Sequence, residues 1–212
     1  MIITDLTHTI SPIMPVYPGT EKPVIVEATT IEKNGFAEKC ITLYSHTGTH
    51  IDSPGHILPG RHTLDQFNAD KFIGRGIVID VAEIRSDSIE KHDIELYAGE
   101  IEASDFVLFN TGWDKYWNDT GYFSGFPVLS KEATAWLCGF PLKGIGLDCI
   151  SIDPVGDMNM ENHTLLFEQD MIIIENLRNL DLLKNIQFMF SCLPLKLEKA
   201  DGSPVRAVGI IL

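Results

Sequence analysis

The residues best suited to chemistry in this 212-residue chain lie close together, in the segment SHTGTHIDSPGH (45–56). Eleven consecutive positions contain His46, His50, Asp52 and His56. Imidazole nitrogens and carboxylate oxygens bind borderline divalent metals such as zinc, manganese or iron. One histidine alone is more often a packed core residue, but three with an aspartate between two of them favour a metal site over a His-rich polar loop. A metal held there could activate water.

The spacing suggests how these side chains would divide their roles. Two histidines, His46 and His50, together with Asp52 would leave coordination positions open for water, as catalytic sites do. Asp52 could offer its second oxygen to a neighbouring ion. His56 is then either a fourth ligand or a free imidazole beside the metal-bound water. In the second role it could shuttle a proton between that water and a leaving group.

Composition and charge limit the class of protein. Hydrophobic residues make up 44% of the chain and charged residues 22%, which is ordinary for a globular protein, and we expect one domain over residues 1–212. No signal peptide is evident, and no apolar run approaches the roughly 20 residues that cross a bilayer, so we expect a cytoplasmic protein. The net charge of −14 argues against nucleic acid or a membrane surface as a partner.

The four cysteines do not form a recognisable framework. They lie far apart and include no CxxC pair, which argues against both a zinc ribbon and a disulfide scaffold. We therefore expect buried free thiols at Cys40, Cys138, Cys149 and Cys192.

Short β-branched and apolar runs bounded by glycine, proline and polar turns predict more strands than helices. This pattern indicates a single mixed α/β domain, with a β-rich core sheet or barrel-like sheet and a few outer helices. His46 should lie at a strand end, and residues 48–54 on a loop or a helix start. The predicted strands cover 2–6, 24–31, 37–44, 76–84, 106–113, 144–153, 171–177, 186–198 and 204–212, and the predicted helices cover 86–101, 131–138 (capped by Ser130) and 161–170.

The run HTGTHIDSPGH (46–56) resembles the HxGTHxDxPxH signature of the cyclase family, which includes bacterial kynurenine formamidases and isatin hydrolases. The resemblance extends to DLTHTISPIMPVYPG, LDQFNADKFIGRGIVIDV, NTGW, GLDCISID and ENHTLLFEQDMIIIENL, and so covers nearly the whole chain. It implies the cyclase-family fold, a homodimer or larger assembly (dimer or tetramer), and an arylformamidase-like activity of the kind used in tryptophan catabolism.

The resemblance also implies a ligand set. His46, His50 and Asp52 would bind a first ion, zinc or manganese, with Asp52 bridging to a second. The second ion would be completed by His163 and by Glu175, twelve residues later. Considered without the family, His163 would be expected on the surface of a helix. Glu175 closes an apolar strand, where a carboxylate needs a partner.

The implied reaction is attack of metal-activated water on the carbonyl of a small N-formyl or cyclic amide, with His56 protonating the departing nitrogen. Tyr17 occupies the position where similar kynurenine formamidases carry a tryptophan against the substrate, although it could equally be a packing aromatic. The alternatives are a lactone or cyclic-imide hydrolase or a ring-closing cyclase on the same site, or a metal- and ligand-binding module without turnover.

Three further polar residues and one loop are candidates for a role near the metal site. Asp148, Ser151 and Asp153 precede a proline in GLDCISIDP, where such residues usually cap backbone groups. The aromatic-rich segment 111–123 is expected to form either a loop over the site or a packed surface loop.

Overall fold

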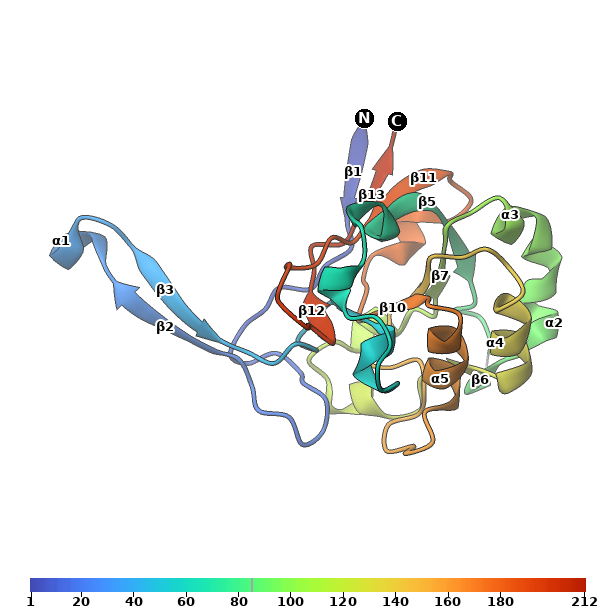
Figure 1. Cartoon of the computed structure of the whole chain (residues 1–212), viewed down its shortest axis with the longest axis horizontal. Helices are drawn as coiled ribbons and strands as arrows, with labels where there is room; N and C mark the ends of the chain where they lie inside the picture. Colours follow the sequence, from blue (N-terminus) through green and yellow to red (C-terminus); the bar gives the residue numbers. More distant parts are fainter. Residues whose placement is uncertain (85) are drawn as a thin grey trace.

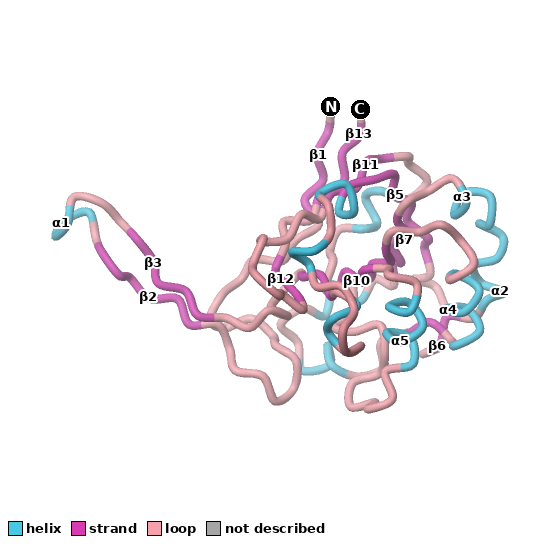
Figure 2. Tube along the Cα trace, in the orientation of Figure 1, coloured by secondary structure: helices cyan, strands magenta, loops and turns pink. Residues whose placement is uncertain are grey.

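The computed structural model describes residues 1–84 and 86–212, and it is built around a nine-stranded, curled mixed sheet (Figures 1 and 2). The four central strands β5, β7, β9 and β10 run parallel, and antiparallel strands flank them on both sides. The mixed α/β prediction is confirmed. In spatial order the strands are β1 (Ile2–Asp5), β13 (Val208–Ile211), β11 (Phe188–Ser191), β5 (Ile73–Asp80), β7 (Phe106–Asn110), β9 (Gly144–Leu147), β10 (Ile172–Glu175), β4 (His50–Asp52) and β12 (Gly202–Pro204).

The central strands are apolar on both faces, as expected for parallel strands covered from both sides. All five residues of β7 are buried. Because successive side chains point to opposite faces, Val107 and Phe109 pack in one hydrophobic layer, whereas Phe106 and Leu108 pack in the other. The first layer is covered by short helices, namely α2 (Lys91–Ile94), α3 (Ala98–Glu102), α4 (Lys131–Leu137) and α5 (Glu161–Glu168).

The second layer lies between the sheet and segments from both ends of the chain, including Leu6, Leu180 and Cys192. Single-turn 3₁₀ helices lie between the larger elements: η1 (Pro54–His56), η2 (Leu64–Gln66), η3 (Ala69–Phe72), η4 (Glu95–Tyr97), η5 (Trp113–Tyr116), η6 (Thr120–Phe123) and η7 (Leu180–Leu183). Within the described residues, no helix is long and apolar enough to cross a membrane.

Several predicted elements differ from the structure. The prediction of a loop or helix start over residues 48–54 is wrong for His50–Asp52, which form the strand β4 between β10 and β12. Gly48 and Thr49 are bends, and Pro54 begins η1. Residues 86–101, predicted to form a single helix, form several separate elements. Ser88 and Ile89 form β6, which pairs with β8 (Val128–Leu129), and the short helices α2 and α3 follow. The last predicted strand is divided into β12 and β13.

Two other predicted strands end earlier than expected: β9 ends at Leu147 and β11 at Ser191. Ser130 caps α4 as predicted, its side chain accepting from the backbone N–H of Ala133. The cysteines are free, but only Cys149 and Cys192 are buried, and Cys40 is exposed. Cys40 lies in a ribbon of two strands, β2 (Val24–Thr29) and β3 (Glu38–Thr42), joined through α1 (Ile31–Asn34), and this ribbon projects away from the body (Figure 1).

Gly144 is required by the close approach of β9 to β10. A β-carbon there would lie 2.5 Å from the carbonyl oxygen of Ile172, which is sheet backbone and cannot move aside. We expect Gly144→Ala to destabilise the protein by about 1–3 kcal/mol, the usual cost of overpacking. Gly99→Ala in α3 is the matched control, since nothing lies within 4 Å of its β-carbon position. Urea unfolding of both variants checks this, and equal stability of the two would contradict it.

Candidate metal centre

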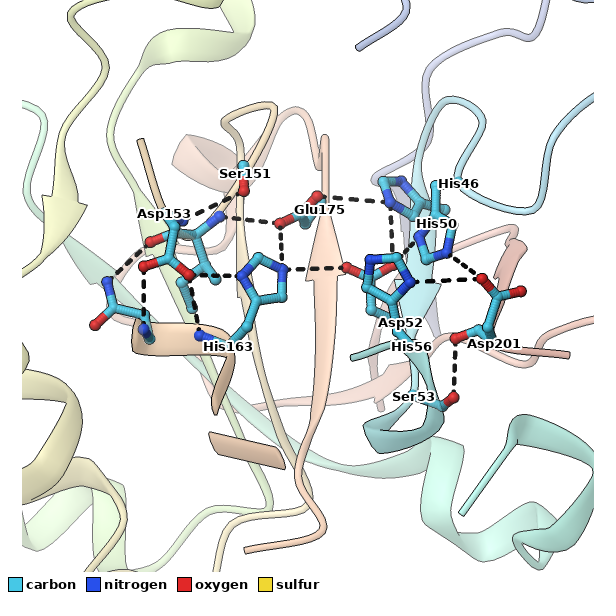
Figure 3. A network of polar contacts seen from close by, with 12 residues as sticks. His46, His50, Asp52, Ser53, His56, Ser151, Asp153, His163, Glu175 and Asp201 are labelled. Carbon is cyan, nitrogen blue, oxygen red and sulfur yellow. Dashed lines mark hydrogen bonds and ion pairs between the residues drawn. The ribbon is translucent and has the colours of Figure 1, made fainter. Parts of the chain in front are cut away.

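The pairing of β4 with β10 brings candidate ligands from distant parts of the chain onto one face of the sheet (Figure 3). His50 and Asp52 are two residues apart in β4 and therefore project to the same side, whereas Ile51 projects into the core. Glu175, the last residue of β10, lies directly opposite His50. All three polar side chains are buried.

The first group of candidate ligands consists of His46, His50 and Asp52, which offer one atom each within 4.8 Å of one another. Oδ1 of Asp52 lies 2.5 Å from Nδ1 of His46 and 3.2 Å from Nε2 of His50. The other nitrogen of His50 is 2.8 Å from the carbonyl oxygen of Gly48, to which it donates. This bond leaves Nε2 of His50 with its lone pair free for a metal.

The second group consists of Asp52, His163 and Glu175. Nε2 of His163 lies 3.7 Å from Oδ2 of Asp52 and 3.6 Å from Oε1 of Glu175. Asp52 therefore directs one oxygen toward each group (Figure 3). His163 is 2% exposed, so the surface position expected for it without the family is wrong.

Asp153 is what holds His163 in place. Its carboxylate accepts from the backbone N–H groups of Asn162 and His163 at the first turn of α5. Oδ2 also lies 2.6 Å from Nδ1 of His163, which leaves Nε2 for a metal. The predicted capping role of Asp153 is thus confirmed, and the carboxylate also orients a ligand. Asp148 likewise accepts from backbone N–H groups, those of Thr111 and Trp113.

The electrostatics of the two groups fit a cation. Burial, assisted by the charge on Asp52, raises the pKa of Glu175 to about 7. Burial opposes charge on His46 and His163, but their carboxylate partners outweigh it and raise the pKa of each to about 10. Two buried carboxylates side by side are costly without positive charge, and here protons supply what a divalent ion would supply. The donor set of three imidazoles and two carboxylates suits zinc or manganese.

His56 lies in η1 beside these two groups without belonging to either, and forms a third group of possible metal ligands with His46 and Asp201. Its ring centroid is 4.0 Å from that of His46, and its side chain is 26% exposed. Burial is the main cause of a pKa below the ordinary value, so the ring is neutral near pH 7. Its Nδ1 is 3.5 Å from Oδ2 of Asp201, a residue that the sequence patterns did not single out.

The other predicted residues support the site from further away. The hydroxyl of Tyr17 accepts from the backbone N–H of Gly156, at 3.1 Å, and so joins the proline-rich segment to the loop before α5. In segment 111–123, Tyr122 is fully buried and its hydroxyl donates to Asn176, whose amide in turn donates to the Gly48 carbonyl. This segment therefore stabilises the turn at Gly48, which lies between His46 and His50.

Comparisons with known proteins identify the family of the chain. The family model described as "Putative cyclase" matches residues 4–154, and the chain belongs to this cyclase family. The kynurenine formamidase of Bacillus mycoides (strain KBAB4) is 34% identical over 169 residues, covering 79% of this chain and 77% of that protein. The kynurenine formamidase of Erythrobacter litoralis (strain HTCC2594) is 28% identical over 207 residues, covering 97% and 92%.

Solved structures give the same result. Isatin hydrolase A from Ralstonia solanacearum is similar with a TM-score of 0.88 at 25% identity, covering 98% of this chain and 91% of that one. A structure titled "Potential Metal-Dependent Hydrolase With Cyclase Activity" has a TM-score of 0.82 at 28% identity, covering 98% and 96%. The family resemblance and the fold predicted from the sequence are both confirmed.

Metal binding should release protons, because ligands must be deprotonated to bind. His46 and His163 have folded-state pKa values of about 10, so at pH 8 both are protonated in the metal-free protein and must lose their protons. Burial opposes charge on His50 too, but the attraction of Asp52 and Glu175 outweighs it and raises the pKa of His50 as well. We therefore expect at least two protons released per molecule at pH 8, with metal affinity falling as pH falls. Calorimetric zinc titration in buffers of different ionisation enthalpy counts these protons.

His92→Ala is the control, since the side chain of His92 is 75% exposed and lies in α2, away from both groups. The count for this variant should equal that of the unmodified protein. Metal binding without proton release at pH 8 would contradict this prediction, because it would show that the metal does not replace the protons of the two histidines.

Proposed function

We propose that this protein is a metal-dependent hydrolase that cleaves a C–N bond, other than a peptide bond, in a small N-formyl or cyclic amide. The observation that carries the proposal is the pair of three-residue ligand groups that share Asp52, with His56 beside them and outside both. The family membership and the kynurenine formamidase relatives support it.

The ligands in this proposal are the five residues of the two groups. His46, His50 and Asp52 hold one divalent ion, and Asp52, His163 and Glu175 hold a second. Zinc and manganese both accept such ligands. When bound, such ions lower the pKa of water and polarise a carbonyl oxygen.

His56 supplies proton transfer in this proposal. Because its ring is neutral near pH 7, it can accept a proton from the attacking water and then donate it to the departing nitrogen. The ring remains partly open to solvent, as a group that exchanges protons with a substrate must be. Tyr17, on the proline-rich segment and 36% exposed, is proposed as an aromatic wall for the substrate.

A cyclic amide is a specific second candidate for the substrate. The isatin hydrolase of Ralstonia solanacearum matches 98% of this chain with a TM-score of 0.88, higher than the 0.82 of the metal-dependent hydrolase described above. Opening a cyclic amide uses the same groups as removing a formyl group, since both begin with attack on an amide carbonyl.

The test pairs metal content with turnover of N-formylkynurenine and of isatin, before and after chelation. The protein as purified should contain about two equivalents of zinc or manganese and lose activity on chelation. His56→Ala should keep its metal and lose roughly 100-fold or more in kcat, the usual contribution of a general acid–base group. Asp52→Asn should lose metal as well as activity. Full activity of His56→Ala, or turnover that survives chelation, would contradict the mechanism.

We also propose that the molecule is a homodimer held together by the projecting ribbon of β2 and β3. Every residue of β3 is exposed, and Val24, Val26 and Ile41 are each more than half exposed. A two-stranded ribbon is marginally stable by itself, so both of its apolar faces need cover. Two copies that exchange ribbons of about 20 Å by 10 Å would bury about 1,600 Å² in all, the size of a stable interface.

The ribbon charge is compatible with a second copy, because the three lysines and four glutamates of residues 20–44 nearly cancel in a chain of net charge −14. Ile41→Lys should therefore weaken the dimer at least tenfold, as measured by light scattering across a dilution series. Leu96→Lys is the control, at a 70% exposed position in η4. In the chain η4 lies between α2 and α3, which lie at the opposite end of the molecule from the ribbon (Figure 1). A monomeric wild-type protein would refute the dimer.

A further inference from the structure

Asp201 lies beside the candidate metal centre, immediately before the edge strand β12. The residue after it, Gly202, pairs with Asp52 of β4. The backbone carbonyl of Asp201 accepts from both the N–H and the hydroxyl of Ser53, at 2.9 and 2.8 Å. These two bonds fix the main chain of Asp201 next to the ligand strand (Figure 3).

Gly202 lets this strand approach the first ligand group closely. A β-carbon at Gly202 would lie 2.5 Å from Cε1 of His46. Only a residue without a side chain therefore allows β12 to bring Asp201 alongside the imidazole ring.

One carboxylate oxygen of Asp201 contacts two histidines. Its Oδ2 lies 3.0 Å from Nε2 of His46 and 3.5 Å from Nδ1 of His56. Because a carboxylate only accepts hydrogen bonds, Nε2 of His46 is the donor in the 3.0 Å hydrogen bond. Nδ1 of His56 faces the same oxygen at an ion-pair distance. The remaining nitrogen of His46, Nδ1, faces Oδ1 of Asp52, and Nε2 of His56 is left for proton transfer.

We propose that Asp201 is a positioning residue that serves the first metal and the proton shuttle together. It selects the tautomer of His46 that presents Nδ1 to the metal, and it orients the ring of His56. This inference rests on the proposed function. Asp153 gives the second group the same support, because it accepts from Nδ1 of His163 and leaves Nε2 for the metal.

A competing role for Asp201 is that of a direct ligand. His46, His56 and Asp201 also lie within 4.8 Å of one another. That arrangement would use Nε2 of His46 for an ion and withdraw it from the Asp201 hydrogen bond. The Asp201 side chain is 45% exposed, whereas that of Asp52 is 2% exposed, and this difference favours support over ligation.

The experiment titrates the metal-free protein with Co²⁺, whose visible spectrum reports each binding event, in competition with a chelator. Asp201→Ala should weaken one of two events by about 10–100-fold and leave the other unchanged, the usual cost of losing a hydrogen-bond partner of a ligating histidine. Asp201→Asn should be milder, since its amide oxygen still accepts from His46. Asp153→Asn should weaken the other event.

Asp181→Asn, an exposed carboxylate in η7, is the matched control and should change neither event. If Asp201→Ala binds both Co²⁺ ions with wild-type affinity, the proposal is overturned. Complete loss of one binding event in both Asp201→Ala and Asp201→Asn would also overturn it, because that result would identify Asp201 as a metal ligand. Thermal unfolding of Asp201→Asn verifies the fold.

A second readout separates this inference from the proposed function. With metal saturating, Asp201→Ala should lower kcat and shift the pH profile of turnover, because His56 has lost its partner, while KM changes little. Unchanged kcat and pH profile at saturating metal would refute the link to His56. If the wild-type protein hydrolyses neither amide yet Asp201→Ala weakens one Co²⁺ event, the hydrolase proposal fails and the metal-positioning role remains.

Discussion

The antiparallel pairing of β4 with β10 on one side and β12 on the other is the constraint on which the centre depends. It fixes the direction of every side chain in the three residues His50–Asp52, so that two polar groups face the site and Ile51 anchors the strand in the core. A slip of one residue would exchange these faces. The apolar contacts of Ile51 therefore protect the register of the ligands.

Around this strand, the candidate ligands His50 and His163 are each oriented by a partner that is not itself a ligand. Gly48 holds His50, and Asp153 holds His163. The partners come from different elements, a turn and a helix cap, so the supports of the centre belong to the fold itself. Tyr122 extends this support through Asn176 to the same Gly48 carbonyl. A site built in this way has its geometry before any ion arrives.

Much of the fold and the first ligand group could be predicted from the sequence, for reasons that also explain the failures. His46, His50 and Asp52 are close in the chain, so their spacing is visible, and apolar runs such as 171–177 show a buried strand directly. Strand β4 was missed because three residues between Gly48 and Pro54 are too short to display a period. Asp201 was missed because 155 residues separate it from His46, and no local pattern reports such a contact.

His163 illustrates an intermediate case. In the polar start of ENHTLLFE it has the pattern of an exposed helix residue, and only the family spacing to Glu175 identified it. Its burial comes from the packing of α5 against β10, which propensity does not report. The helix predicted over 86–101 was divided for a similar reason, since the pairing of Ser88 and Ile89 with β8 depends on a strand forty residues away.

The long sequence separations within the centre also bear on how the chain folds. The backbone of Asp201 accepts from Ser53 across 148 residues. Strand β4 therefore has its second neighbour, β12, only when the chain extends to Pro204. Contacts between residues so far apart in the sequence are expected to form late in folding, after the pairing of the parallel strands, which are separated by shorter loops. A nascent or C-terminally truncated chain would thus carry the histidines without the assembled centre. Metal capture would accordingly mark completion of folding and stabilise the whole molecule against global opening.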